Sequence, residues 1–115
     1  AVLEFTKGYG DKFALETDPF MAASGADILI TDTWTSMGEE AEKEERKKIF
    51  KDYQINRQLL AAANAGAMVQ HCLPAYRGQE ITEEVFEEHA DEIFNEAENR
   101  LHAQKAVMVK LMKKD

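Results

Sequence analysis

Apolar positions fall in short blocks along the chain, and the blocks predict strands separated by helices. Residues 27–31 (Asp-Ile-Leu-Ile-Thr) and residues 67–70 are strongly apolar runs of strand length. We expect two further short strands over 12–16 and 92–95. Strands with continuous apolar faces, separated by helices, are typical of a parallel sheet that is covered on both faces. The pattern therefore predicts the α/β class.

Capping and pairing signals predict the helices between these strands. Asp18-Pro19 places an N-cap aspartate before a proline at the first helical position. The order Ser36-Met-Gly-Glu39 has the spacing of a capping box, and Glu42/Arg46 pair at i, i+4 in the charged segment that follows. The expected helices lie at 2–7, from 18 to near 25, from 39 to 53, at 54–64, at 82–89 and from 96 onward.

Composition narrows the class of protein. The chain has 115 residues, with 14 Lys+Arg against 22 Asp+Glu and a net charge of −8, which disfavours binding to nucleic acid. Its single cysteine excludes an internal disulfide and a multi-cysteine zinc site. No apolar run approaches the roughly 18 residues that a membrane span requires. We therefore expect a soluble, reduced, intracellular domain.

The candidate chemistry follows the predicted strands. The carboxyl ends of parallel strands meet at one edge of a sheet, where ligands bind. The polar side chains placed there are Asp32, His71, Cys72, Arg77, Glu96, Glu98, Asn99, Arg100 and His102. Their mixture of carboxylates, a thiol and cations predicts a site for an anionic or zwitterionic small molecule.

Each of these residues also has a structural interpretation. Asp32 is as suited to capping a turn as to binding a ligand, and Ser36 is better suited to an N-cap. A lone Cys72 is more often a small buried hydrophobe, and Arg77 before Gly78 is compatible with a loop cation. Arg100, in the first turns of the terminal helix, opposes the helix dipole and indicates an anionic partner, either a ligand or Glu96 one turn earlier. The three histidines show no metal-ligand spacing.

Three segments carry a resemblance to a known family. Residues 32–38 are Asp-Thr-Trp-Thr-Ser-Met-Gly, residues 71–78 are His-Cys-Leu-Pro-Ala-Tyr-Arg-Gly, and residues 95–106 begin Asn-Glu-Ala-Glu-Asn-Arg. In order and approximate spacing they closely resemble ornithine carbamoyltransferase, and the resemblance covers nearly the whole chain. It implies a doubly wound, Rossmann-like parallel sheet flanked by helices, here only in part.

The resemblance implies a reaction. In that family the δ-amine of L-ornithine attacks carbamoyl phosphate, giving L-citrulline and phosphate, with no cofactor and no metal. By resemblance, the residues expected to bind ornithine are Asp32, Ser36 and Met37. Those expected to bind carbamoyl phosphate are Cys72, Leu73 and Arg100, and the Leu73-Pro74 bond is expected to be cis.

Cys72 and Asp32 are the expected catalytic residues. The resemblance places the thiol close to the attacking amine, and the carboxylate where it can hold an ammonium group. Because the amine of ornithine is mostly protonated at neutral pH, a base is required. Asp32, Cys72 and solvent all remain candidates for it.

The resemblance also implies that much of the family's chain lies outside these residues. The N-terminal carbamoyl-phosphate domain, with its Ser-Thr-Arg-Thr-Arg type loop, has no counterpart, and neither has the family's Gly-Asp-Gly-Asn-Asn strand. We therefore expect residues 1–115 to be a single piece, the C-terminal part of the ornithine-binding domain. Strand 27–31 would then have an open apolar edge. The isolated chain is expected to be inactive, and to self-associate or to need its missing half.

Two interpretations of the function remain open at this point. One is a fragment of an ornithine carbamoyltransferase, and the other is a non-catalytic α/β binding or scaffold domain derived from that fold. By resemblance, the small-molecule partners are L-ornithine and carbamoyl phosphate, the parent enzyme is a homotrimer of arginine metabolism, and the location is cytoplasmic. Neither a nucleic acid nor a membrane is expected as a partner. The motifs do not distinguish amino-acid biosynthesis from catabolism.

Overall fold

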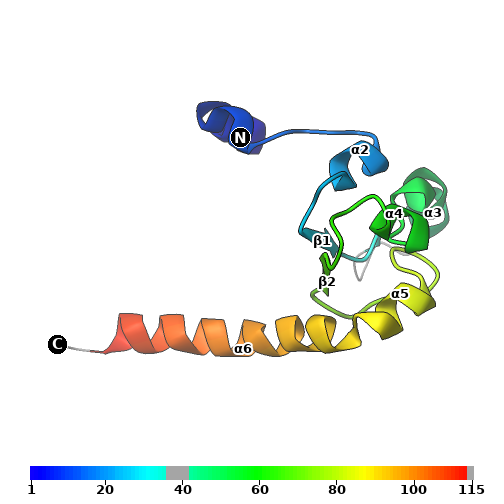
Figure 1. Ribbon diagram of the computed structural model, residues 1–115. Helices are drawn as coiled ribbons and strands as arrows, with labels where there is room; N and C mark the ends of the chain where they lie inside the picture. The colour runs from blue at the N-terminus through cyan, green and yellow to red at the C-terminus, as the bar shows by residue number, and fades with distance from the viewer. Residues whose placement is uncertain (36–41, 114–115) are drawn as a thin grey trace.

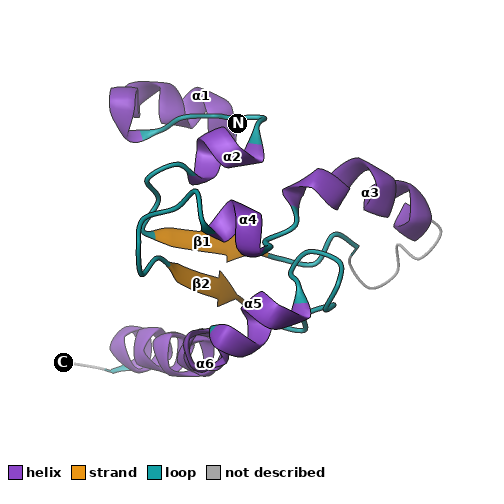
Figure 2. Ribbon diagram, turned by 45° about the vertical axis from the view of Figure 1, so that its right-hand side comes forward, coloured by secondary structure: helices purple, strands orange, loops and turns teal. Residues whose placement is uncertain are grey.

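Two parallel strands form the centre of the computed structural model, which describes residues 1–35 and 42–113. Strand β1 (Ile28–Thr31) pairs with β2 (Met68–His71), in a register that runs from Ile28↔Met68 to Thr31↔His71. Figure 2 shows the two arrows side by side and pointing the same way. The strands predicted at 27–31 and 67–70 are confirmed, with bounds that differ by at most one residue. The predicted α/β class is also confirmed.

Helices and short 3-10 helices lie before, between and after the two strands along the chain. They are α1 (Val2–Thr6), η1 (Lys7–Lys12), α2 (Pro19–Ala23), α3 (Lys43–Phe50), η3 (Lys51–Tyr53), α4 (Arg57–Leu60), α5 (Glu83–Glu88) and α6 (Ala90–Met112). In Figure 1, α6 runs past the strands with its C-terminal half extending away from them, and α1 stands on the other side of the molecule.

Two local predictions about the helices are confirmed. The Asp18 carboxylate accepts the backbone N–H groups of Phe20 and Met21, and so caps α2. Arg46 of α3 pairs at 3.1 Å with Glu42, the residue that precedes the helix. The predicted capping box at 36–39 lies outside the described residues.

The core lies on one face of the two strands. Because side chains alternate along a strand, Leu29, Val69 and His71 point to the same face and are buried there. Residues from the helices and loops complete the apolar cluster: Ala23, Ile55, Leu59, Ile81, Val85, Phe86 and Ile93. This face therefore holds the described part of the chain together.

The other face is largely bare in the described part of the chain. Ile28 is 47% exposed, Ile30 is 68% exposed and Met68 is also exposed. The expectation that both faces are covered is therefore wrong for these residues. In addition, β1 pairs with β2 alone among the described strands, so its second edge carries no strand partner there.

The strand predicted at 12–16 is not formed. Lys12 ends η1, Phe13 has an extended backbone, and residues 13–16 have no ladder partner in the described part of the chain. Phe13 and Leu15 are both exposed. An isolated segment gains no ladder hydrogen bonds, so its apolar residues alone do not make a strand.

The strand predicted at 92–95 is part of α6 instead. Ile93 is fully buried, while Phe94 on the next position is 55% exposed. The Glu92 carboxylate accepts the Val69 N–H of β2 at 2.8 Å, so a side chain of α6 satisfies this strand N–H. Glu92 also bonds His89 Nδ1 at 2.9 Å.

The predicted helix at 54–64 is shorter than expected. Asn56 caps α4 by accepting the Leu59 N–H at 2.9 Å, and the helix ends at Leu60. The following residues turn toward β2 through Gly66, whose φ of +79° favours glycine. Asn64 closes this turn by donating to the Gly25 carbonyl and to Asp27.

Candidate functional site

The ends of the two strands bring a carboxylate and a thiol together. Thr31 and His71 are register partners, so the residues that follow them, Asp32 and Cys72, leave the sheet side by side. Cys72 Sγ donates to Asp32 Oδ1 at 3.4 Å, and the Thr33 N–H donates to the same oxygen at 2.7 Å. The expectation that these two strand ends meet at one edge is confirmed.

The environment of Cys72 favours the neutral thiol. Burial is the main factor that raises the thiol pKa, and the hydrogen bond to Asp32 and the charge of Asp32 raise it further. Glu96 adds a smaller increase, while the positive charge of Arg100 opposes it. The thiolate is the nucleophilic form of cysteine, so this site does not present an activated nucleophile.

Arg100 reaches the same edge from α6. Its Nη1 donates to the Cys72 carbonyl oxygen at 3.3 Å, and the side chain is otherwise exposed. Arg100 lies ten residues beyond the first residue of α6, so the argument that placed it in the first turns of a helix is wrong. Among the residues that the structure describes, Arg100 and Glu96 form no ion pair. A guanidinium has five N–H donors, which leaves donors for an anionic ligand.

The loop after β2 turns sharply beyond Cys72. The Leu73-Pro74 bond is cis, which confirms the expectation from the resemblance, and Leu73 has a φ of +56°. The Leu73 N–H donates to His71 Nδ1 at 2.9 Å. His71 Nε2 in turn contacts Glu80 Oε1 at 3.0 Å, and both side chains are fully buried.

Glu80 is a residue that the sequence pattern did not single out. It stands in the polar stretch Gly-Gln-Glu-Ile-Thr, where nothing indicates that its side chain is buried. Glu80 Oε2, Thr35 Oγ1 and Glu96 Oε2 are buried and have no hydrogen-bond partner among residues 1–35 and 42–113. Thr35 follows the Asp32 segment, and Glu96 acts on the Cys72 thiol, so both belong to this region of the molecule.

The other sequence candidates take different positions. Arg77 pairs with Glu83 and Glu87 and lies over the Phe86 ring, as expected of a loop cation. Ser36 and Met37, the remaining expected ornithine-binding residues, lie outside the described residues.

One group of potential metal ligands lies at this edge, formed by Asp32, His71 and Cys72 with ligand atoms within 4.8 Å of one another. The two ring nitrogens of His71 are already engaged, one by the Leu73 N–H and the other by Glu80. A metal needs a free imidazole lone pair. The observed bonding therefore does not fit a metal centre at these three residues.

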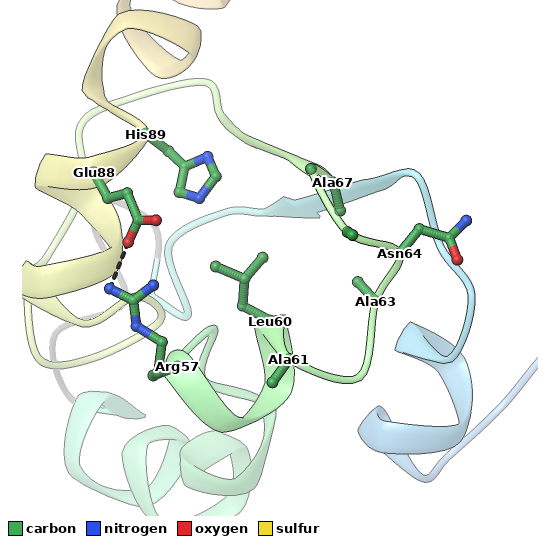
Figure 3. Close-up of a pocket in the computed structure, with 10 residues that line it drawn as sticks. Arg57, Leu60, Ala61, Ala63, Asn64, Ala67, Glu88 and His89 are labelled. Carbon is green, nitrogen blue, oxygen red and sulfur yellow. Dashed lines mark ion pairs between the residues drawn. The ribbon is translucent and has the colours of Figure 1, made fainter.

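A separate cavity of about 370 Å³ lies at the opposite end of β2 (Figure 3). Its lining includes four alanines, Ala61, Ala63, Ala65 and Ala67, and Arg57 pairs there with Glu88. Because Ala67 in its lining precedes β2, the cavity is remote from the carboxyl ends of the strands. Among the residues the structure describes, no helix is long and apolar enough to cross a membrane.

A parallel strand pair with polar side chains at its carboxyl ends is the arrangement of a ligand-binding α/β domain. The chain belongs to the family described as "Aspartate/ornithine carbamoyltransferase, Asp/Orn binding domain", which matches residues 1–111. The individual proteins described next, to which the chain is similar, are named ornithine carbamoyltransferase.

Three relatives illustrate this similarity. Ornithine carbamoyltransferase of Nitratiruptor sp. is 54% identical over 112 residues, covering 97% of this chain and 36% of the relative. That of Gloeobacter violaceus is 58% identical over 103 residues, covering 90% and 33%. The crystal structure of anabolic ornithine carbamoyltransferase from Campylobacter jejuni superposes with a TM-score of 0.86 at 48% identity, covering 95% of this chain and 36% of that one. The chain thus spans about a third of the length of these proteins.

Proposed function

We propose that this chain supplies the amino-acid side of a carbamoyl transfer from carbamoyl phosphate to the δ-amine of L-ornithine. The contact between Asp32 and Cys72 at the strand ends, with Arg100 on the Cys72 carbonyl, carries the proposal. The names of the relatives support ornithine as the acceptor. In this proposal Asp32, Ser36 and Met37 bind ornithine, and Cys72, Leu73 and Arg100 face carbamoyl phosphate.

The chemistry assigned to these groups is mainly positioning. The neutral amine nitrogen forms a bond to the carbonyl carbon, the bond from that carbon to the phosphate oxygen breaks, and the departing phosphate takes the proton that the nitrogen releases on bond formation. Before this step, the ammonium group of ornithine has to lose one proton so that its nitrogen has a lone pair. Asp32 is the carboxylate placed to attract the ammonium group and to take that proton. Cys72, kept as a thiol by its surroundings, orients the amine beside Asp32 rather than attacking the substrate. Arg100 stabilises negative charge on the carbamoyl phosphate side.

We further propose that the chain works only together with the remainder of a carbamoyltransferase. It spans about a third of its relatives, and it exposes Ile28, Ile30 and Met68 on one sheet face. An exposed apolar face beside an open strand edge favours association. The alternative, a non-catalytic scaffold derived from this fold, predicts no activity in any combination.

Complementation tests the proposal. The chain is assayed for citrulline formation alone, and then mixed with the remaining part of the Nitratiruptor relative. Activity in the mixture, lost with Asp32→Ala and kept with Asp52→Ala, which removes an exposed carboxylate of η3, is the expected result. Equal activity of the Asp32 and Asp52 variants would refute the assignment, and silence of a mixture that forms a complex would favour the scaffold.

A further inference from the structure

Two buried polar side chains lie directly behind the candidate reaction site. His71 and Glu80 are both 0% exposed, and their Nε2 and Oε1 atoms are 3.0 Å apart. Burying such groups is unfavourable unless they are hydrogen-bonded. The mechanism proposed above uses neither of them, although His71 is adjacent in sequence to Cys72.

Their hydrogen bonds end on the backbone of the reaction loop. His71 Nδ1 accepts the Leu73 N–H at 2.9 Å, and Glu80 Oε1 accepts the Tyr76 N–H at 2.6 Å. The pair therefore holds the loop at both ends of residues 73–76. The first of these bonds also fixes Leu73 at a φ of +56°, a conformation that non-glycine residues rarely adopt.

The bonding determines the tautomer of His71. Because a backbone N–H donates to Nδ1, that nitrogen carries the lone pair, and the ring proton is on Nε2. Nε2 then donates to Glu80, whose carboxylate stabilises this tautomer. In the opposite tautomer, the ring N–H on His71 Nδ1 would face the backbone N–H of Leu73, and no hydrogen bond would form.

Glu80 is itself held in place by the core. Its carbonyl oxygen accepts the Ile55 N–H at 2.9 Å, and the neighbouring Ile81 is fully buried. The position of the loop is thus tied to the interior of the domain through Glu80 and then His71.

We propose that His71 and Glu80 are positioning residues that hold the Cys72-Leu73 segment in its reactive geometry, with His71 acting as a hydrogen-bond acceptor of fixed tautomer. The role in catalysis rests on the proposed function. The positioning of Cys72 against Asp32 does not depend on the proposed function, and a separate experiment measures it.

The single cysteine of the chain provides the probe, because the rate of its alkylation against pH reports the Cys72 pKa without interference. The charged groups that act on this thiol are Asp32, Glu96 and Arg100. Two variants of similar shape are compared. His71→Asn keeps an acceptor oxygen where Nδ1 stood, and His71→Leu removes it.

We expect His71→Leu to shift the thiol pKa down toward its ordinary value, because Cys72 loses its placement beside Asp32. His71→Asn retains a raised thiol pKa. Both variants lose the bond to Glu80, so a difference between them is due to the Leu73 acceptor and not to general destabilisation. An unshifted pKa in both variants, or an equal shift in both, overturns the proposal.

A measurement on the unaltered chain covers the case in which a variant does not fold. The ¹⁵N chemical shifts of the His71 ring distinguish the two tautomers, and we expect the proton on Nε2. A proton on Nδ1 overturns the proposal.

In the complemented enzyme, His71→Leu is expected to lower kcat by about 10- to 100-fold, with a smaller change in KM, since a displacement near 1 Å costs on the order of 100-fold. Unchanged kcat beside a shifted thiol pKa refutes the catalytic role alone. Absence of citrulline from the unaltered mixture refutes the proposed function, and leaves the thiol result standing.

Discussion

Removal of the Glu92 carboxylate tests how the edge of the sheet is closed. In the structure, Glu92 accepts the N–H of Val69, which is fully buried, and it also bonds His89. Glu92→Ala therefore leaves one strand N–H without a protein acceptor. Glu98→Ala is the matched control, because Glu98 also pairs with a histidine on α6 but accepts no strand N–H.

The expected magnitude follows from the lost bond. An unsatisfied buried donor costs about 1–3 kcal/mol. The Glu92 side chain is 35% exposed, so a water molecule can partly replace the carboxylate as acceptor of the Val69 N–H. We therefore expect Glu92→Ala to lower the free energy of unfolding by about 1–2 kcal/mol. An exposed pair such as Glu98–His102 contributes about 0–1 kcal/mol. Urea unfolding followed by circular dichroism measures both variants, and equal losses would refute the role assigned to the Val69 bond.

The pH dependence gives a second check on Glu92. Burial raises its pKa, but the hydrogen bonds from His89 and the Val69 N–H outweigh burial, and the net pKa lies below the ordinary 4.5. A carboxyl whose folded pKa is depressed stabilises the fold above its unfolded pKa, and this contribution is lost as pH falls through the folded pKa. The difference in the free energy of unfolding between the unaltered chain and Glu92→Ala should therefore become smaller below about pH 4.5. A difference that grows on acidification would contradict this account.

Three further predictions concern the site and the core. Asp32→Asn should lower the Cys72 thiol pKa, measured by alkylation against pH, because the carboxylate charge that raises it is removed; an unchanged pKa would contradict the Asp32–Cys72 contact. Arg100→Gln should raise the Cys72 thiol pKa further, since the guanidinium stabilises the thiolate. A lower thiol pKa in this variant would contradict the position of Arg100 beside Cys72. Ile93→Ala should destabilise the fold by about 2–5 kcal/mol in urea unfolding, and a loss below about 0.5 kcal/mol would show that Ile93 is not in the core.

The strands and the strand-end site could be predicted because their signals are local. Residues 27–31 and 67–70 are continuous apolar runs, and the parallel arrangement then places Asp32 beside Cys72. The segment at 92–95 could not be assigned from periodicity, because a short apolar run is compatible with a strand or a helix. What decides it is tertiary: Glu92 bonds the Val69 N–H, and this requires a helix alongside β2.

The positioning pair shows a different limit of sequence reasoning. Glu80 stands among polar neighbours and has no pattern that indicates burial, so only the structure shows that it contacts His71. The side chain of Arg100 does lie at the site, although the helix-dipole argument for it was wrong, because α6 begins well before the expected residue 96.

The choice of acceptor amine decides whether this chain binds ornithine in a carbamoyl transfer. The family match names aspartate and ornithine together, whereas the account assigns ornithine to this chain. The complemented protein is given carbamoyl phosphate with L-ornithine or with L-aspartate, and the carbamoylated product is identified by mass spectrometry. The account predicts citrulline from ornithine and no carbamoyl aspartate. Formation of carbamoyl aspartate in preference to citrulline would contradict it.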